Sequence, residues 1–121
     1  MMSGEETADA GLRYFVVQGT AKPEILQKIT ENPIDPWPGA EAMVAGIPGA
    51  KLIDYYFEVG TTRNLAIVAL PSSMDAASIT YQRMATGFME DMNLFEVLPS
   101  SQVKEMLERV KKLNEIDYLS E

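Results

Sequence analysis

The chain lacks cysteine and histidine altogether, and these two absences exclude more chemistry than any other feature of its 121 residues. Without cysteine it can form no disulfide, no zinc–thiolate site and no iron–sulfur cluster, and it has no cysteine nucleophile. Without histidine it loses the commonest general base, the usual haem ligand and most transition-metal sites. We therefore expect neither a bound metal nor a cofactor.

Positive charge and long apolar runs are also scarce. Ten Lys and Arg residues face eighteen Asp and Glu residues, which gives a net charge of −8. Such a chain repels phosphate backbones and anionic membrane surfaces, so we expect no nucleic-acid partner and no membrane partner. No apolar run reaches the ~18 residues of a transmembrane helix. The first residues are acidic and lack the apolar stretch of a secretory signal, so we expect a cytoplasmic location.

What is present suits one globular domain. The hydrophobic fraction of 46% is enough for a core, and the length fits a single unit. Residues 1–10 are small and polar, and we expect them to be disordered. Residues 11–121 are expected to form the domain.

Hydrophobic periodicity and turn residues predict the order of the elements. The pattern is strand, helix, strand, strand, helix, strand, followed by a terminal helix. Strands are predicted at 12–18, 50–59, 64–70 and 93–98, and helices at 22–30, between 72 and 87, and from about 101 to 114, with a short helical piece at 40–45. This order is the ferredoxin-like βαββαβ arrangement, an α+β fold whose antiparallel sheet has the strand order 4-1-3-2.

Two of these strands raise the question of what covers the sheet. Strand 64–70 is apolar at odd and even positions alike, so both of its faces need cover, and the two main helices cover only one face of the sheet. We therefore expect a homodimer that closes through the sheet face.

In strand 50–59, strict alternation predicts one dry and one mixed face. The dry face is Ile53, Tyr55, Phe57 and Val59, and the mixed face is Leu52, Asp54, Tyr56 and Glu58.

The helix between 72 and 87 carries clear end signals. Ser72 with Asp75 three residues later resembles a capping box, and Gly87 is a suitable C-terminal stop. Helical spacing predicts that its packing stripe is Ala77, Tyr81, Met84 and Phe88.

The hairpin Val59–Arg63, the strand that ends at Pro71, and the segment Asp91–Val97 resemble the dimeric α/β-barrel superfamily. Within it the chain is similar to the GYD family and to a related domain of unknown function. The resemblance implies a ferredoxin-like fold and a dimer, but no established reaction. The tyrosine and aspartate that name the family are replaced by Thr62 and Arg63, so no role of that pair carries over.

Six residues are candidate ligand-binding residues, and each has a simpler structural explanation. They are Tyr14, Trp37, Asp54, Tyr56, Arg63 and Asn64.

Arg63 and Asn64 lie at the hairpin, where an arginine can hold a carboxylate or enolate, or can simply solvate the turn or pair with an acid across the dimer. Asp54 would be a base with a raised pKa if buried in a dimer cleft, or else part of a polar edge strand.

The aromatic candidates have similar alternatives. Trp37 stands between two prolines, and its segment would be either a lid over a pocket or an anchor for a stiff loop. Tyr14 and Tyr56 would donate to a developing oxyanion, or pack in the core with their hydroxyls at its rim.

These residues leave two functions open. The first is a dimeric protein of uncharacterised activity that binds a small apolar or aromatic molecule between its sheet and helices. The second is a cofactor-independent monooxygenase or isomerase that acts on an aromatic or enolisable substrate, as some members of the resembled superfamily do.

Overall fold

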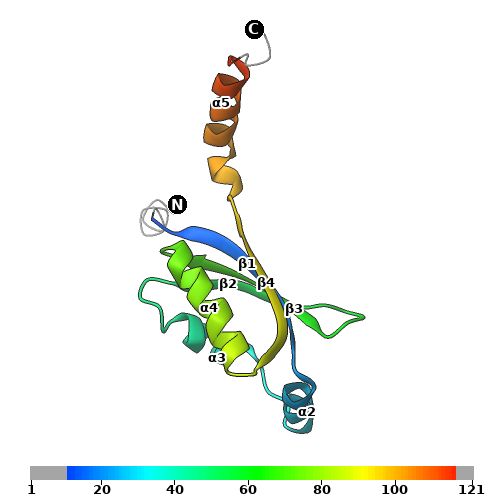
Figure 1. Cartoon of the computed structure of the whole chain (residues 1–121). Coiled ribbons are helices and arrows are strands. Elements are labelled where there is room, and N and C mark those ends of the chain that lie inside the picture. The colour runs from blue at the N-terminus through cyan, green and yellow to red at the C-terminus, as the bar shows by residue number, and fades with distance from the viewer. Residues whose placement is uncertain (1–10, 117–121) are drawn as a thin grey trace.

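The computed structural model of the chain describes residues 11–116, so the segment 1–10, for which the sequence predicts disorder, lies outside the described residues. Four strands form one antiparallel sheet in the order β2-β3-β1-β4, which is the predicted order read from the other edge. Together with the helices this is a ferredoxin-like α+β fold (Figure 1). The elements in chain order are β1 (Arg13–Ala21), α2 (Pro23–Glu31), α3 (Trp37–Val44), β2 (Lys51–Phe57), β3 (Arg63–Leu70), α4 (Ser73–Ala85), β4 (Met89–Val97), the 3-10 turn η1 (Ser100–Gln102) and α5 (Val103–Asn114).

The end signals of α4 are confirmed. The Ser72 hydroxyl accepts a hydrogen bond from the Asp75 backbone N–H at 3.2 Å and donates one to the Asp75 carboxylate at 2.8 Å. At the other end Gly87 has a φ of 75°, the left-handed conformation in which helices commonly stop.

Strand β1 is longer than the sequence predicts, because it does not end at Gly19. It runs through Gly19 to Ala21 and pairs with both β3 and β4 along the way. A Cβ atom on Gly19 would lie 2.6 Å from Met89 Cε and 2.7 Å from the Asp91 carbonyl oxygen. The glycine is therefore a point of close approach between β1 and β4 and not a strand terminator.

The predicted alternation of β2 is wrong at its start because the strand contains an irregularity. Leu52 pairs with Val68, but the next paired residue is Asp54, opposite Ile67, so Ile53 is the extra residue. The insertion shifts the side-chain alternation by one position. Leu52 therefore lies on the same face as Tyr55 and Phe57, where all three face the helices.

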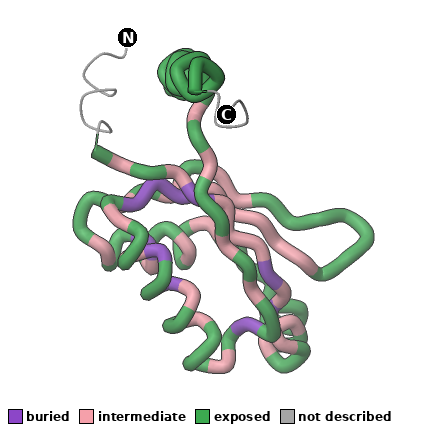
Figure 2. The backbone as a smooth tube through the Cα atoms, turned by 45° about the horizontal axis from the view of Figure 1, so that its top comes forward, coloured by how far each residue is buried: buried purple, intermediate pink, exposed green. Residues whose placement is uncertain are grey.

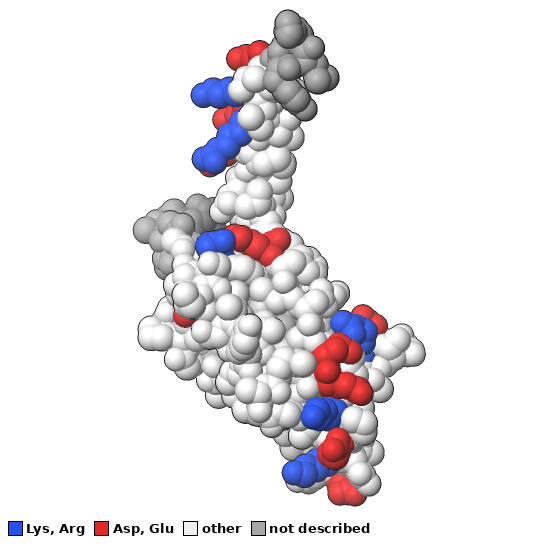
Figure 3. Space-filling model, in the orientation of Figure 1, with Lys and Arg blue, Asp and Glu red and all other residues white. Residues whose placement is uncertain are grey.

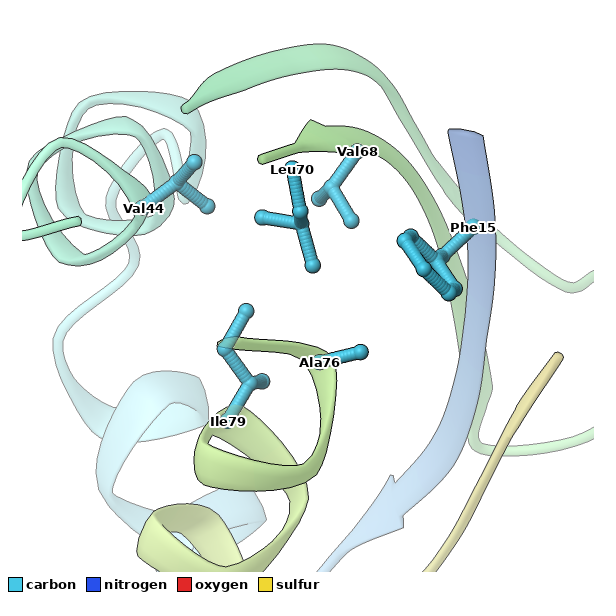
Figure 4. Packing of buried hydrophobic residues seen from close by; sticks show 6 residues of the cluster. All are labelled: Phe15, Val44, Val68, Leu70, Ala76 and Ile79. Atoms are coloured by element: carbon cyan, nitrogen blue, oxygen red, sulfur yellow. The ribbon is translucent and has the colours of Figure 1, made fainter. Parts of the chain in front are cut away.

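The core lies between the sheet and the helices α3 and α4. Its fully buried centre is small, and Figure 4 shows its side chains converging from β1, β3, α3 and α4. The cluster consists of Phe15, Val44, Val68, Leu70, Ala76 and Ile79. Alternation then places Tyr14, Val16, Leu65, Ile67, Phe95 and Val97 on the opposite side of the sheet. None of α2, α3 and α4 packs there, and we call this side the open face.

The predicted packing stripe of α4 is wrong. Ala76 and Ile79 are the buried residues of this helix, whereas Tyr81 is 77% exposed and Met84 lies at the surface. The helix is rotated so that Ala76 and Ile79 meet the core. This rotation also turns Arg83 inward, and Arg83 becomes important for the site described below.

Helix α5 projects away from the rest of the molecule, as Figures 1 and 2 both show. Its one extensive contact with another described element is with η1, directly before it. It is amphipathic but contains no buried residue. No helix in the described part of the chain is long and apolar enough to cross a membrane.

Candidate functional site

A cleft of about 640 Å³ opens between the helix-covered face of the sheet and the segment that contains α3. All four strands contribute to its floor. Its walls come from the end of α2, the α2–α3 connection, α3, α4 and the start of β4. The lining residues are Val17, Ile29, Pro33, Ile34, Pro36, Gly39, Ala40, Met43, Val44, Leu52, Tyr55, Phe57, Asn64, Ala66, Val68, Ile79, Arg83, Phe88, Met89 and Met92.

The proline-rich connection forms one wall of this cleft. Pro33, Ile34 and Pro36 line it, although all three are largely exposed to solvent on their other sides. Proline restricts the backbone of this connection, so the wall is stiff. Asp35 strengthens the start of α3, because its carboxylate accepts a hydrogen bond from the Trp37 backbone N–H at 3.0 Å.

The lining is almost entirely apolar, with three residues that carry polar side chains. They are Tyr55 from β2, Asn64 from β3 and Arg83 from α4. No aspartate or glutamate is among the described residues that line the cleft. A predominantly apolar cleft with a few polar groups is the usual form of a small-molecule site.

Arg83 is the cation of the cleft. Its guanidinium carbon lies 3.9 Å from the centroid of the Phe88 ring, so the guanidinium stacks on that ring. Its Nη1 lies 3.5 Å from Met43 Sδ, a weak acceptor. Burial lowers the pKa of Arg83, and the neighbouring Tyr55 partly opposes this effect. The group nevertheless stays charged at any physiological pH.

Tyr55 is the hydroxyl donor of the cleft. Its ring lies 4.9 Å from that of Phe57, centroid to centroid, with the two planes tilted by 41°. Burial raises the pKa of Tyr55, and the positive charge of Arg83 offsets part of that rise. The phenol is therefore neutral near pH 7 and able to donate a hydrogen bond.

The structure separates the six residues that sequence reasoning selected. Asn64 lines the cleft. Trp37 is half-buried at the start of α3 and is not part of the lining, although Pro36 beside it is. The other four lie on the open face by their pairing register: Tyr14 on β1, Asp54 and Tyr56 on β2, and Arg63 on β3.

Arg63 joins three strands on the open face. Its Nη1 donates to the Asp91 carboxylate at 3.0 Å and to the Thr20 hydroxyl at 3.4 Å, while its Nη2 donates to Asn93 Oδ1 at 3.3 Å. Its partners thus come from β1, which lies beside β3, and from β4, which lies on the far side of β1. The acid that pairs with Arg63 therefore belongs to its own chain, in place of the expected acid across a dimer.

Sequence reasoning missed Arg83, and the reason is physical. The large apolar residues Tyr81, Met84 and Phe88 suggest one helix register, but the residues of α4 that are buried are Ala76 and Ile79. A register anchored on Ala76 and Ile79 places residue 83 on the same face, because positions i, i+3 and i+7 align. That spacing was the available signal.

No group of three or more acidic residues within residues 11–116 is arranged to hold a metal ion. The carboxylates nearest to arginines are occupied: Glu96 by Arg13 at 2.6 Å and Asp91 by Arg63 at 3.0 Å.

The fold and the cleft together define a ferredoxin-like α+β domain with a sheet–helix cleft. No family model matches the chain, and no curated protein matches its sequence. Two crystal structures of one Agrobacterium tumefaciens protein, described as a NipSnap family protein with unknown function, are structural neighbours. One has a TM-score of 0.41 at 16% identity and covers 73% of this chain and 87% of that chain. The other has a TM-score of 0.43 at 17% identity and covers 72% and 92%. The fold class itself rests on the strand order of this chain.

Proposed function

We propose that this protein binds a small apolar or aromatic molecule in the cleft between its sheet and its helices. The observation that carries the proposal is the cleft itself, with a volume of about 640 Å³ and an almost wholly apolar lining. Ligand sites typically enclose about 300–1,000 Å³ and combine apolar walls with a few polar groups. The monooxygenase or isomerase alternative needs a base, and the described lining offers no carboxylate for that role.

The cleft is formed differently from a gap left by poor packing. Its floor is the ordered sheet, and one wall is a proline-stiffened segment that adds almost nothing to the buried core. A stiff wall held off a sheet keeps space open without a ligand, which lowers the entropic cost of binding.

The test is to fill the cleft and measure the binding of a neutral probe. In Ala40→Trp an indole ring would occupy space in the cleft, because Ala40 lines it. We expect wild-type protein to bind N-phenyl-1-naphthylamine, seen as enhanced probe fluorescence, and Ala40→Trp to weaken this binding about tenfold or more.

The matched control is Ala85→Trp, which adds the same ring at an exposed position of α4 outside the lining. It should bind the probe as wild type does. Equal binding by the wild type and Ala40→Trp would place the probe elsewhere, and an absence of binding to the wild type would contradict the proposal.

We further propose that two copies associate through the open face, in keeping with the likeness of the hairpin Val59–Arg63 to GYD-like dimeric barrels. Val16, Ile67 and Phe95 are neighbours across three strands of this face, and Phe95 is 45% exposed. A two-fold contact would bury these side chains against their own counterparts, which favours a symmetric pair.

Sedimentation velocity tests the dimer at micromolar concentration. The wild type should sediment as twice the 13.4 kDa chain, whereas Phe95→Asp should be monomeric because it would bury two like charges against an apolar surface. Met74→Asp on α4, where residue 74 is 74% exposed and remote from the open face, should stay dimeric. A monomeric wild type would overturn this proposal and leave the cleft proposal intact.

A further inference from the structure

Arg83 is set apart from the other arginines by its partners. The chain has four arginines, and three of them form ion pairs: Arg13 with Glu96, Arg63 with Asp91, and Arg109 with Glu105. Arg83 has no carboxylate partner among the described residues, although it is partly buried, whereas Arg13 and Arg109 are exposed. In a chain with a net charge of −8, an arginine without an acid is notable.

The two contacts that Arg83 does make are weak for a cation. A thioether sulfur and an aromatic face hold the guanidinium in place, but neither neutralises it. A guanidinium carries five N–H donors in a fixed planar fork, and one of them is directed at Met43 Sδ. No side-chain N or O atom in the described part of the chain is fully buried and unpartnered, so the remaining donors of Arg83, a residue that lines the cleft, are accessible to a ligand or to water.

The surroundings of Arg83 favour an anion. The described lining contains no acidic side chain that would repel one, and the two other polar residues, Tyr55 and Asn64, can donate hydrogen bonds. Low polarity strengthens a charge-assisted hydrogen bond compared with the same bond in water. The remaining walls are apolar, so the rest of the ligand must be apolar as well.

We infer that the cleft takes an organic carboxylate with an aromatic or acyl body, and that Arg83 binds the carboxylate while the apolar walls hold the body. The inference rests on the proposed function and specifies the ligand class of the same site. The planar fork of an arginine matches the two oxygens of a carboxylate, which gives this anion its geometric advantage.

A pair of probes of nearly the same shape, one charged and one neutral, tests the inference. The probes are 2-naphthoate and 2-naphthamide, which have the same ring and nearly the same shape. Isothermal titration calorimetry with the wild type should show tighter binding of the naphthoate by about tenfold or more, the size of one charge-assisted hydrogen-bonded contact. In Arg83→Gln this preference should disappear, and the naphthamide should bind as it does to the wild type.

Two further variants keep the test decisive. Arg109→Gln makes the same change on the exposed helix α5 and should keep the full preference for naphthoate. Arg83→Lys keeps the charge but not the planar fork, and it should retain part of the preference even if Arg83→Gln does not fold.

The outcomes separate this inference from the proposal on which it rests. If wild-type protein binds both probes equally and Ala40→Trp weakens both, the cleft binds apolar molecules but Arg83 only packs on Phe88, and the inference is overturned. If the preference persists in Arg83→Gln, another group supplies it, and the inference is again overturned. If neither probe binds the wild type although N-phenyl-1-naphthylamine does, the inference is overturned and the proposed function stands. If N-phenyl-1-naphthylamine does not bind either, the proposed function fails and takes the inference with it.

Discussion

The two faces of the one sheet both carry apolar side chains, but only one of them is covered by helices of the described part of the chain. The face that carries Phe15, Val68 and Leu70 packs against α3 and α4, yet the fit leaves a cleft at one end. The open face, with Val16 and Ile67, has no helix of residues 11–116 over it and relies on cross-strand contacts. A sheet therefore does not need two layers from its own chain, and the two faces offer two different kinds of binding surface.

Charge is also unevenly distributed over the molecule. In the view of Figure 3 the charged side chains gather along α5 and around the opposite end of the molecule, while the middle over α4 is nearly free of charge. Arg83 is the exception inside the cleft, where its charge lies among apolar residues.

The largest loss of stability should come from a substitution on the face of the sheet that the helices cover. Leu70 is fully buried, so Leu70→Ala should lower the free energy of unfolding by about 3 kcal/mol through lost contacts and a cavity. Ile67→Ala on the open face should cost only about 1 kcal/mol in dilute solution, because that side chain is partly exposed already. Urea denaturation measures both. Equal losses would mean that the open face is covered as well as the other.

The junction of β1 and β4 should give the next largest effect. In Gly19→Ala the new methyl group would overlap the Asp91 carbonyl oxygen, which is backbone and cannot move aside, so we expect a loss of about 2 kcal/mol. Gly11→Ala adds the same atom where nothing lies within 4 Å and should change stability by less than about 0.5 kcal/mol. Thermal melts of Gly19→Ala and Gly11→Ala measure the difference in stability. If Gly19→Ala were as stable as the wild type, β4 would be able to shift away from the new methyl group.

Arg63 on the open face should contribute less to the free energy of unfolding than its number of partners implies. Arg63→Ala removes contacts to β1 and β4 that are open to solvent, so the loss should stay below about 1 kcal/mol and shrink as salt is added. Urea denaturation at low and high ionic strength measures this. A large loss that salt does not reduce would indicate that Arg63 is shielded from water, as it would be inside a dimer.

The smallest effect should come from Glu96 and should depend on pH. A hydrogen bond from Arg13 is the main cause that lowers the pKa of Glu96 from its ordinary value of 4.5. A lowered pKa in the folded state means that this carboxylate adds stability above its ordinary pKa and loses it as the pH falls through the lowered one. Glu96→Gln should therefore be slightly less stable than the wild type near pH 7 and equal to it in acid. Thermal melts of both proteins from pH 7 down into acid measure this. A difference in stability that does not change with pH would contradict the prediction.

Much of the fold could be predicted because local signals agreed with one another. Ser72, Asp75 and Gly87 marked the ends of α4, and turn residues separated β2 from β3. The candidate site was harder to predict, because it depended on which way each element faces. The extra residue Ile53 in β2 brings Leu52 into the cleft beside the expected Tyr55 and Phe57, and the rotation of α4 brings in Arg83.

The sequence by itself determined the order of the elements, the strand order of the sheet and the absence of cysteine and histidine chemistry. These follow from hydrophobic periodicity, turn residues and composition, all of which are local properties. The tertiary structure alone decided that Arg83 lies in an apolar cleft without a carboxylate while Arg63 pairs across the open face. The reason is that packing sets the rotation of a helix and the register of a strand, and a shift of one residue exchanges the side chains that face the core for those that face away.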